Sequence, residues 1–249
     1  MAIIENNPLE LKARLAAAGI TIYIKDGRTV LRPAHSDQPR RMSRKQFALR
    51  QRMIHNNTLW RLLRAAAEPR FEGGSSPCHR FRALNTQSPD VFLTRDQHLL
   101  GASLLLPGMV VSDGPLEEIG YSLGTADGAP ALVTDLDPRA PRGERYRLYS
   151  LRQEEQQGIP RLSIAAREFA LKDLSAAPDA SGLRLLAAGG GVALAGSVFA
   201  DPMCGFALVR LRGGEASSQR VVTGCDLYRR FATDEALLAA AATYGGLTR

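Results

Sequence analysis

Alternating hydrophobic and polar residues predict a β-hairpin near the start of the chain. Residues 20–24 and 29–32 alternate in the manner of strands. Between them, Asp26-Gly27 is a pair that suits the two-residue type I′ turn of a hairpin. A polar linker with two prolines, residues 33–42, joins this hairpin to the next patterned segment.

The next segment has the period of a helix. Ser43, followed three residues later by Gln46, is typical of a capping box, and Pro69 marks the end of the pattern, so we expect a helix up to about residue 67. Trp60 is interpreted as a core anchor rather than a base-stacking platform. Five apolar residues recur at the 3.6-residue period and predict one buried stripe: Leu49, Met53, Trp60, Leu63 and Ala67.

From residue 71 onward, short apolar segments alternate with turns rich in glycine and proline. Such spacing is typical of an antiparallel β-sandwich of the immunoglobulin or fibronectin type III kind. A loop-like segment at residues 173–182 separates two groups of predicted strands. The first group is 90–94, 102–106, 109–112, 116–122, 131–135, 146–152 and 162–171, and the second is 183–187, 192–199, 206–212 and 218–223.

These patterns predict a mainly β protein with two antiparallel β-sandwich modules, an N-terminal hairpin plus helix, and a C-terminal helix. The predicted domains are a basic hairpin–helix arm at 1–70, a first module at 71–173, and a second module with the C-terminal helix at 174–249. Thr233 is the expected cap of that last helix, and Gly245-Gly246 its stop. We expect the helix to pack on the second sheet.

Three cysteines are too few for a disulfide scaffold. If the hairpin formed by residues 206–212 and 218–223 is symmetric about residues 214 and 215, Cys204 faces Cys225 across it. Pro202 and Gly205 could bend the chain before that position. We therefore expect two reduced, partly buried thiols rather than a disulfide.

Three segments carry a resemblance to known sequences: residues 23–33, residues 43–52, and residues 206–210 together with 217–219. Through them the chain resembles members of an uncharacterised bacterial domain-of-unknown-function family of small β-sandwich-like proteins. The resemblance implies β-sandwich modules. Because such families have no assigned reaction, it implies no catalytic residue.

Composition places the chain among globular proteins. It has 249 residues, of which 45% are hydrophobic and 23% charged, which excludes a disordered, collagen-like or coiled-coil protein. The most apolar stretches, 99–111 and 185–200, are interrupted by glycine or proline and are shorter than the roughly 20 residues of a membrane helix. The N-terminal residues lack the pattern of a secretory signal. We expect a cytoplasmic protein without membrane contact.

The positive charge is concentrated at the N-terminus. Residues 1–70 hold 14 of the 32 basic residues and 5 of the 25 acidic ones, a balance of +9, whereas the other 179 residues carry −2. This distribution is typical of a protein that meets phosphates or an acidic partner, although a solvated basic surface explains it equally well. The candidate contact residues for nucleic acid or a partner are Arg40, Arg41, Arg44, Lys45 and Arg52.

Motifs for metal, cofactor or catalytic chemistry are weak. Cys78-His79 is the only adjacent pair of soft ligands, and in an extended segment its side chains would diverge. Asp135 and Asp137 lie on one side of a predicted strand end, where a solvated turn is the stronger interpretation. Ser75–His79 offers a hydroxyl beside a base but no identifiable acid. We therefore expect no metal, no cofactor and no catalytic residue.

Three hypotheses for function follow from these observations. The favoured one is a non-catalytic structural or protein-interaction component that binds a protein partner or assembles with itself, with an assembly encoded by a mobile element as one setting. The alternative is a nucleic-acid-binding protein that uses the basic residues of 1–70. An enzyme with an unrecognised site ranks last.

Overall fold

The computed structural model divides the chain into two units, Met1–Arg41 and Met42–Arg249. It describes residues 20–25, 28–33, 42–73, 76–139, 143–175, 177–180, 182–188 and 191–248. In the first unit, β1 (Ile20–Lys25) pairs with the antiparallel β2 (Arg28–Pro33), and Lys25 faces Arg28. This register leaves two residues for the connection and confirms the predicted hairpin. The turn itself lies outside the described residues.

The second unit begins with helix α2 (Arg44–Ala66), which confirms the predicted helix. Its start is the predicted capping box. The Ser43 Oγ accepts a hydrogen bond from the Gln46 backbone N–H at 3.3 Å, and the Gln46 Oε1 accepts one from the Ser43 N–H at 3.0 Å. Two of the unpaired N–H groups at the helix start are thereby satisfied by side chains.

The buried stripe predicted for α2 is only partly right. Leu63 is buried, and Trp60 packs against Phe81 and Phe71 with ring centroids 5.5 and 6.0 Å apart. Leu49 and Met53, however, are 54% and 38% exposed. The buried side runs instead through residues spaced about four apart, several of them polar: Phe47, Gln51, His55, Asn56, Leu59 and Leu63.

The polar members of that row are buried because neighbouring backbone groups need partners. The Leu93 N–H donates to the Gln51 Oε1 at 3.2 Å, and the Asn56 Nδ2 donates to the Asn85 carbonyl at 3.3 Å. Buried backbone groups are costly without such bonds, so a polar side chain at these positions stabilises more than an apolar one. Hydropathy alone therefore predicts the wrong side of α2 to be buried.

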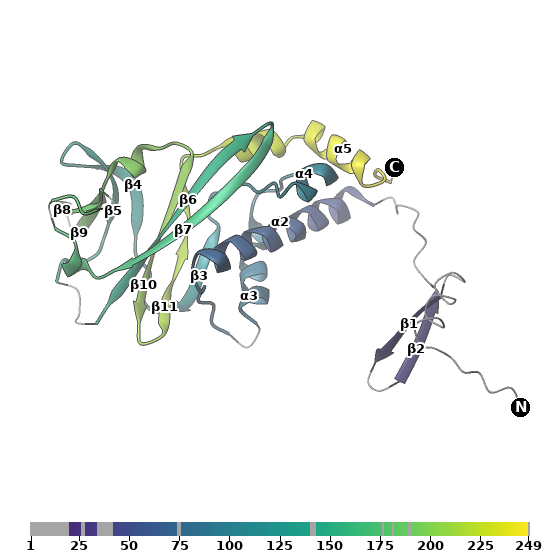
Figure 1. Cartoon of the computed structure of the whole chain (residues 1–249), viewed down its shortest axis with the longest axis horizontal. Coiled ribbons are helices and arrows are strands. Elements are labelled where there is room, and N and C mark those ends of the chain that lie inside the picture. Colours follow the sequence, from purple (N-terminus) through teal and green to yellow (C-terminus); the bar gives the residue numbers. More distant parts are fainter. Residues whose placement is uncertain are drawn as a thin grey trace, which may run out of the picture. The chain divides into compact units, whose positions relative to one another are not determined.

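Ten of the strands, β12 included, form two antiparallel sheets (Figure 1). The larger sheet has the order β3 (Val110–Pro115), β11 (Glu215–Arg220), β10 (Cys204–Arg212), β6 (Arg145–Gln156) and β7 (Ile159–Phe169), with β12 (Val222–Thr223) on β10. The smaller sheet has the order β4 (Tyr121–Ala126), β5 (Ala129–Thr134), β9 (Gly191–Ala195) and β8 (Arg184–Ala188). The chain is therefore mainly β, as predicted.

The larger sheet buries both of its faces. Alternate residues of β6 and β10, such as Leu148 and Leu208, belong to a core shared with Leu132 and Leu194 of the smaller sheet. The residues between them face the other way and belong to a second core, which includes Leu59 and Leu63 of α2. Helix α3 (Pro77–Leu84) contributes Phe81 to this second core. The order of layers is helices, six-stranded sheet, four-stranded sheet.

The predicted boundary between two β modules at residues 173 and 174 is wrong. Strands from both sides of it share each sheet, because β10 pairs with β6 and β9 pairs with β5. The predicted arm at 1–70 is divided as well, since α2 belongs to the unit Met42–Arg249. Local hydropathy finds strands but carries no information about which distant strand each one pairs with.

The C-terminal helix α5 (Asp234–Thr243) begins at the predicted cap, where the Thr233 Oγ1 accepts from the Ala236 N–H at 3.1 Å. Gly245 and Gly246, with φ of 99° and 86°, follow its end. The expected packing on the second sheet is wrong. Leu237, Ala240 and Ala241 share a core with Phe47 at the start of α2 and with Phe92.

Some predicted strands are absent and some helices were not predicted. Residues 90–94, 102–106 and most of 116–122 are not strands. Helix α4 (Arg95–Leu99) has a Thr94–Gln97 capping box, and α3 has Ser76 as its cap with Pro77 in its first turn. Four short 3₁₀ segments complete the described elements: η1 (Asn85–Gln87), η2 (Leu171–Asp173), η3 (Ser197–Ala200) and η4 (Leu227–Phe231).

The hairpin of β10 and β11 turns one residue earlier than predicted. Arg212 pairs with Glu215, so Gly213 and Gly214 form the turn, with φ of 59° and 94°. Positive φ at both positions is the type I′ geometry, which a Gly-Gly pair adopts without strain. Farther along β10, the pairing with β12 is shifted by one residue and Gly205 faces Thr223, so Cys204 does not face Cys225. Both cysteines are buried free thiols.

Candidate functional site

Three of the five sequence-predicted contact residues, Arg44, Lys45 and Arg52, lie on α2. Arg40 and Arg41 lie outside the described residues. Arg44 forms an ion pair with Asp234, and Lys45 is exposed. The Arg52 Nε and Nη2 donate to the Asp90 Oδ1 at 3.0 and 2.7 Å, and its Nη1 donates to the Thr86 carbonyl at 2.6 Å. Arg52 therefore ties α2 to η1 and to Asp90, which follows it.

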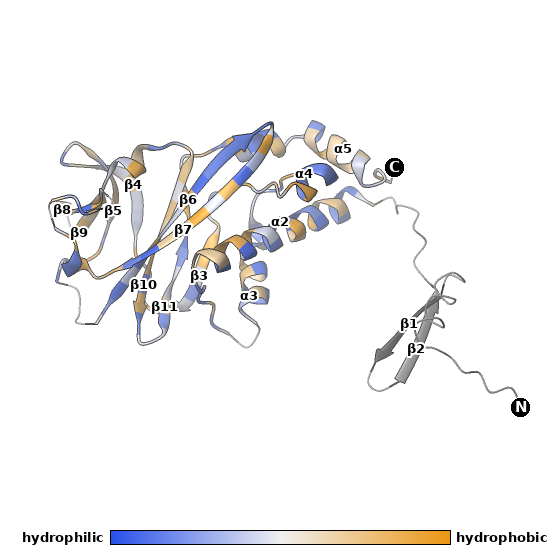
Figure 2. Cartoon of the chain, viewed as in Figure 1, coloured by the Kyte–Doolittle hydropathy of each residue, from blue (hydrophilic) through white to orange (hydrophobic). Residues whose placement is uncertain are grey.

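A group of exposed apolar side chains lies on the helices instead. We call it the apolar helical surface. Among the described residues, six large hydrophobic side chains are exposed, and five of them are on α2, α4, α5 or the residue that ends α4. Figure 2 shows apolar residues on these helices at one end of the second unit. The five are Leu49, Met53, Leu99, Leu100 and Leu238, which are 54%, 38%, 76%, 53% and 62% exposed.

Polar and aromatic contacts hold these three helices together. The His98 Nε2 of α4 lies 2.9 Å from the Gln51 Oε1 of α2, and the Arg95 N–H donates to the Thr243 Oγ1 of α5 at 3.0 Å. The Arg50 guanidinium stacks 4.8 Å from the centre of the Tyr244 ring. The exposed leucines are therefore carried on a braced support rather than on separate loops.

A second feature is the charged end of the six-stranded sheet. Strand β6 starts where β10 ends, so Tyr146 faces Arg210 and Arg145 faces Leu211. Strand β7 ends beside them, with Glu168 opposite Arg147. Antiparallel pairing thus brings together arginines that are far apart in the sequence.

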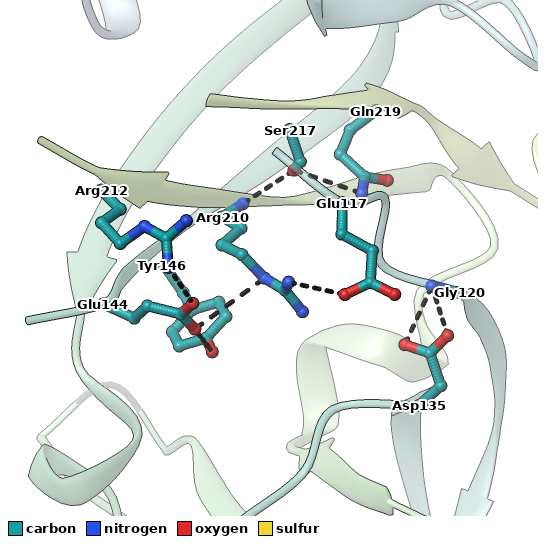
Figure 3. Close-up of polar contacts among 9 residues, drawn as sticks. All are labelled: Glu117, Gly120, Asp135, Glu144, Tyr146, Arg210, Arg212, Ser217 and Gln219. Atoms are coloured by element: carbon teal, nitrogen blue, oxygen red, sulfur yellow. Dashed lines mark hydrogen bonds and ion pairs between the residues drawn. The ribbon is translucent and has the colours of Figure 1, made fainter. Parts of the chain in front are cut away.

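A pocket of about 380 Å³ opens at this end on the side of the four-stranded sheet. We call it the Glu144 pocket. The Glu144 side chain is only 4% exposed. Its Oε2 accepts a hydrogen bond from the Tyr146 hydroxyl at 2.7 Å, and the Arg210 Nε and Arg212 Nη1 lie 3.9 Å from its two oxygens. Figure 3 shows the carboxylate between these groups.

The Glu144 pocket is held in place from neighbouring strands. The Arg210 N–H donates to the Ser217 Oγ of β11 at 3.0 Å, and the Arg210 Nη1 donates to the exposed Glu117 at 3.2 Å. Burial, together with the bond to Glu144, raises the pKa of Tyr146. Tyr146 therefore stays protonated at neutral pH and donates to Glu144, which is the role of a structural brace.

The weak metal and nucleophile motifs do not converge. Cys78 and His79 lie on α3, not in an extended segment. Asp135 accepts from the Gly120 N–H with both carboxylate oxygens at 3.0 Å, as Figure 3 shows, and Asp137 accepts from the Arg139 N–H at 2.8 Å. Within the described ranges, no group of three potential metal ligands was found.

The two buried thiols are poor nucleophiles. Burial and the neighbouring Asp201 raise the pKa of Cys204 to about 11, and burial raises the pKa of Cys225. Because the thiolate is the reactive form, both side chains stay inert at neutral pH.

No family model, curated protein or solved structure matches the chain. In the part of the chain that the structure describes, no helix is both long and apolar enough to cross a membrane.

Sequence reasoning missed both the apolar helical surface and the charged end of the sheet. The charged end had a recognisable signal, because Arg210 and Arg212 repeat at the two-residue period within a predicted strand, and Arg145 and Arg147 repeat in the same way at the start of another. The apolar helical surface had none: Leu99 and Leu100 look like core residues in the sequence, and Leu49 and Met53 fit a buried stripe.

Proposed function

We propose that the protein is a non-catalytic interaction component that binds a protein partner, or a second copy of itself, through the apolar helical surface. The observation that carries the proposal is the concentration of exposed large apolar side chains on α2, α4 and α5. Exposed apolar side chains that gather on one part of a protein are typical of protein interfaces. Burial of one exposed leucine side chain in an interface contributes about 2 kcal/mol to the free energy of binding.

The test replaces Leu99 and Leu238 with glutamate. These are the two most exposed of the group, at 76% and 62%, so the double variant keeps the core intact. Val198→Glu is the matched control, since Val198 is 36% exposed on η3, away from these helices. Sedimentation over a concentration series and affinity capture from a native lysate measure association.

We expect the wild-type protein to associate, the double variant to lose that association, and Val198→Glu to retain it. Circular dichroism confirms that each variant is folded. A wild-type protein that stays monomeric at every concentration, and that captures nothing the double variant does not also capture, contradicts the proposal.

The apolar core shared by the two sheets is compatible with a sandwich of the immunoglobulin or fibronectin type III kind. A cytoplasmic location fits the three free cysteines. The segments that carry the family resemblance include β2, the start of α2, and parts of β10 and β11, and we keep that resemblance as an expectation.

Nucleic-acid binding is the second candidate, and one observation favours it. Helix α2 has 23 residues with six basic side chains and no acidic one, and Lys45, Arg61 and Arg64 are exposed. Titration of DNA and RNA at two salt concentrations tests it, because phosphate contacts make affinity fall steeply with salt.

The informative variant replaces four of the basic residues with glutamine: Arg40, Arg41, Arg44 and Lys45. The control variant replaces four exposed arginines elsewhere with glutamine, which changes the charge equally: Arg139, Arg152, Arg161 and Arg229. If the first variant binds like the control, the arm is not a nucleic-acid site.

A further inference from the structure

The charged end of the sheet has a second pocket on its helix-facing side, of about 180 Å³. We call it the Arg147 pocket. Its lining includes four arginines, Arg70, Arg145, Arg147 and Arg212, but only two acids, Glu168 and Glu215. The lining thus carries two more positive than negative charges. The Glu144 pocket differs, because Glu117, Asp137 and Glu144 outnumber its two arginines.

Arg147 and Glu168 form a fixed, charge-balanced floor. The Arg147 side chain is 8% exposed, and its Nε and Nη2 donate to the Glu168 Oε1. Its Nη1 donates to the Glu68 carbonyl at 2.7 Å and to the Tyr149 hydroxyl at 3.1 Å. Every nitrogen of this guanidinium has a partner, so Arg147 supports the site rather than recognising a ligand.

The other three arginines still have donors to offer. Arg70, Arg145 and Arg212 lie 3.8, 3.7 and 3.9 Å from the carboxylates of Glu68, Glu168 and Glu144, which is beyond hydrogen-bond distance. Their side chains are 41%, 58% and 55% exposed. They come from three parts of the chain: the segment after α2, the start of β6 and the end of β10.

The rim beside them is open. Gly213 and Gly214 form the β10–β11 turn and line the pocket, and a side chain at either position would meet no atom within 4 Å. The pocket is smaller than the roughly 300–1,000 Å³ of sites for drug-sized ligands. It has room for one compact charged group and not for a whole nucleotide.

We propose that the Arg147 pocket binds a phosphoryl dianion, either as the free ion or as the phosphate group of a small ester. Arginines from three parts of the chain line the pocket, and a tetrahedral phosphoryl group has enough oxygens to accept hydrogen bonds from more than one guanidinium at once. A carboxylate has two oxygens in one plane and satisfies fewer. The site is separate from the apolar helical surface, so the failure of either proposal leaves the other standing.

Isothermal titration calorimetry at low salt tests the proposal, with inorganic phosphate and O-phosphoserine as two arms and acetate as the control probe. We expect saturable binding of phosphate and none of acetate. Stronger binding of O-phosphoserine than of phosphate identifies an ester as the ligand, and the reverse identifies the free ion.

Three variants and one control variant sharpen the result. Arg145→Gln and Arg212→Gln should each weaken phosphate binding roughly tenfold, the effect of losing one charge-assisted hydrogen bond. Glu215→Gln should strengthen binding, because it removes a negative charge from the pocket lining and leaves the floor intact. Arg161→Gln, an exposed arginine of β7 that does not line the pocket, should change nothing. Absence of saturable phosphate binding, or equal binding by Arg145→Gln, Arg212→Gln and wild type, overturns the proposal.

Discussion

His55 is a buried histidine on α2, 2% exposed, that joins the helix to the apolar segment beneath it. Its Nε2 lies 3.2 Å from the Leu104 carbonyl oxygen. A carbonyl only accepts, so Nε2 carries the hydrogen and donates, and Nδ1 is left without one. Burial, with a smaller contribution from His98, lowers the pKa of His55 to about 4.

This pKa makes stability depend on pH in a defined window. In the unfolded chain His55 titrates near 6.5, whereas in the folded protein it stays neutral down to about 4. The unfolded state therefore binds more protons between these values, and stability falls as the pH drops from about 6.5 to 4. The loss from this one group is about 3 kcal/mol.

Urea unfolding of wild type and His55→Gln at pH 7 and pH 4.5 measures the effect. Carboxylates titrate in both proteins, so the difference between them isolates His55. We expect the wild type to lose more stability than the variant between the two pH values. Equal losses would show that His55 does not carry the effect.

At the element scale, the segment at residues 102–106 is buried without joining a sheet. Gln153 of β6 takes the place of a neighbouring strand. Its Oε1 accepts from the Leu105 N–H at 2.7 Å, and its Nε2 donates to the Ser103 carbonyl at 3.2 Å and the Arg161 carbonyl at 3.0 Å. The Ser103 Oγ in turn accepts from the Leu162 N–H at 2.9 Å.

Replacing Gln153 with alanine should therefore cost about 3 kcal/mol, because it leaves buried backbone groups of this segment unpaired. Gln156→Ala on the same strand is the matched control, since Gln156 is exposed and should change stability by less than about 0.5 kcal/mol. Chemical unfolding measures both. Similar costs for the two variants would contradict the role assigned to Gln153.

Elements with a local signature could be predicted from the sequence. The Ser43 and Thr233 caps and the pairing of β1 with β2 depend on residues close together in the sequence, and all are present at the predicted places. The segment at 102–106 could not be assigned in this way. A short apolar run fits a buried strand and a buried coil equally well, and the partners that decide between them lie about 50 residues away.

The candidate sites were less predictable than the fold. Exposure of Leu49 depends on Gln51 and His55 being buried in place of apolar residues, which no hydropathy pattern indicates. The Arg147 pocket needs the register of β6 against β10 and β7 before its arginines can be placed near one another. Long-range pairing thus determines both surfaces.

At the scale of the whole molecule, each sheet contains strands from before and after residue 174. We therefore predict that the parts of the second unit before and after this residue cannot fold separately. Residues 174–249 contain β8 to β12 but lack β6, the partner of β10, and β5, the partner of β9. We expect this fragment to be unfolded, whereas residues 42–249 should unfold in one cooperative transition.

Circular dichroism and amide chemical-shift dispersion of the two fragments provide the measurement. A well-dispersed spectrum from residues 174–249 alone would restore the two-module arrangement.

The pairing of β6 with a strand that lies later in the chain also has a consequence during synthesis. Strands β6 and β7 emerge from the ribosome before β10, which ends at Arg212, about 40 residues after Phe169. At roughly 5–20 residues per second, the long β6–β7 hairpin waits between about 2 and 8 s with the β10-facing edge of β6 unpaired. Nascent chains of this protein are therefore expected to be clients of ribosome-associated chaperones during that interval, and slower translation should lengthen their exposure to aggregation.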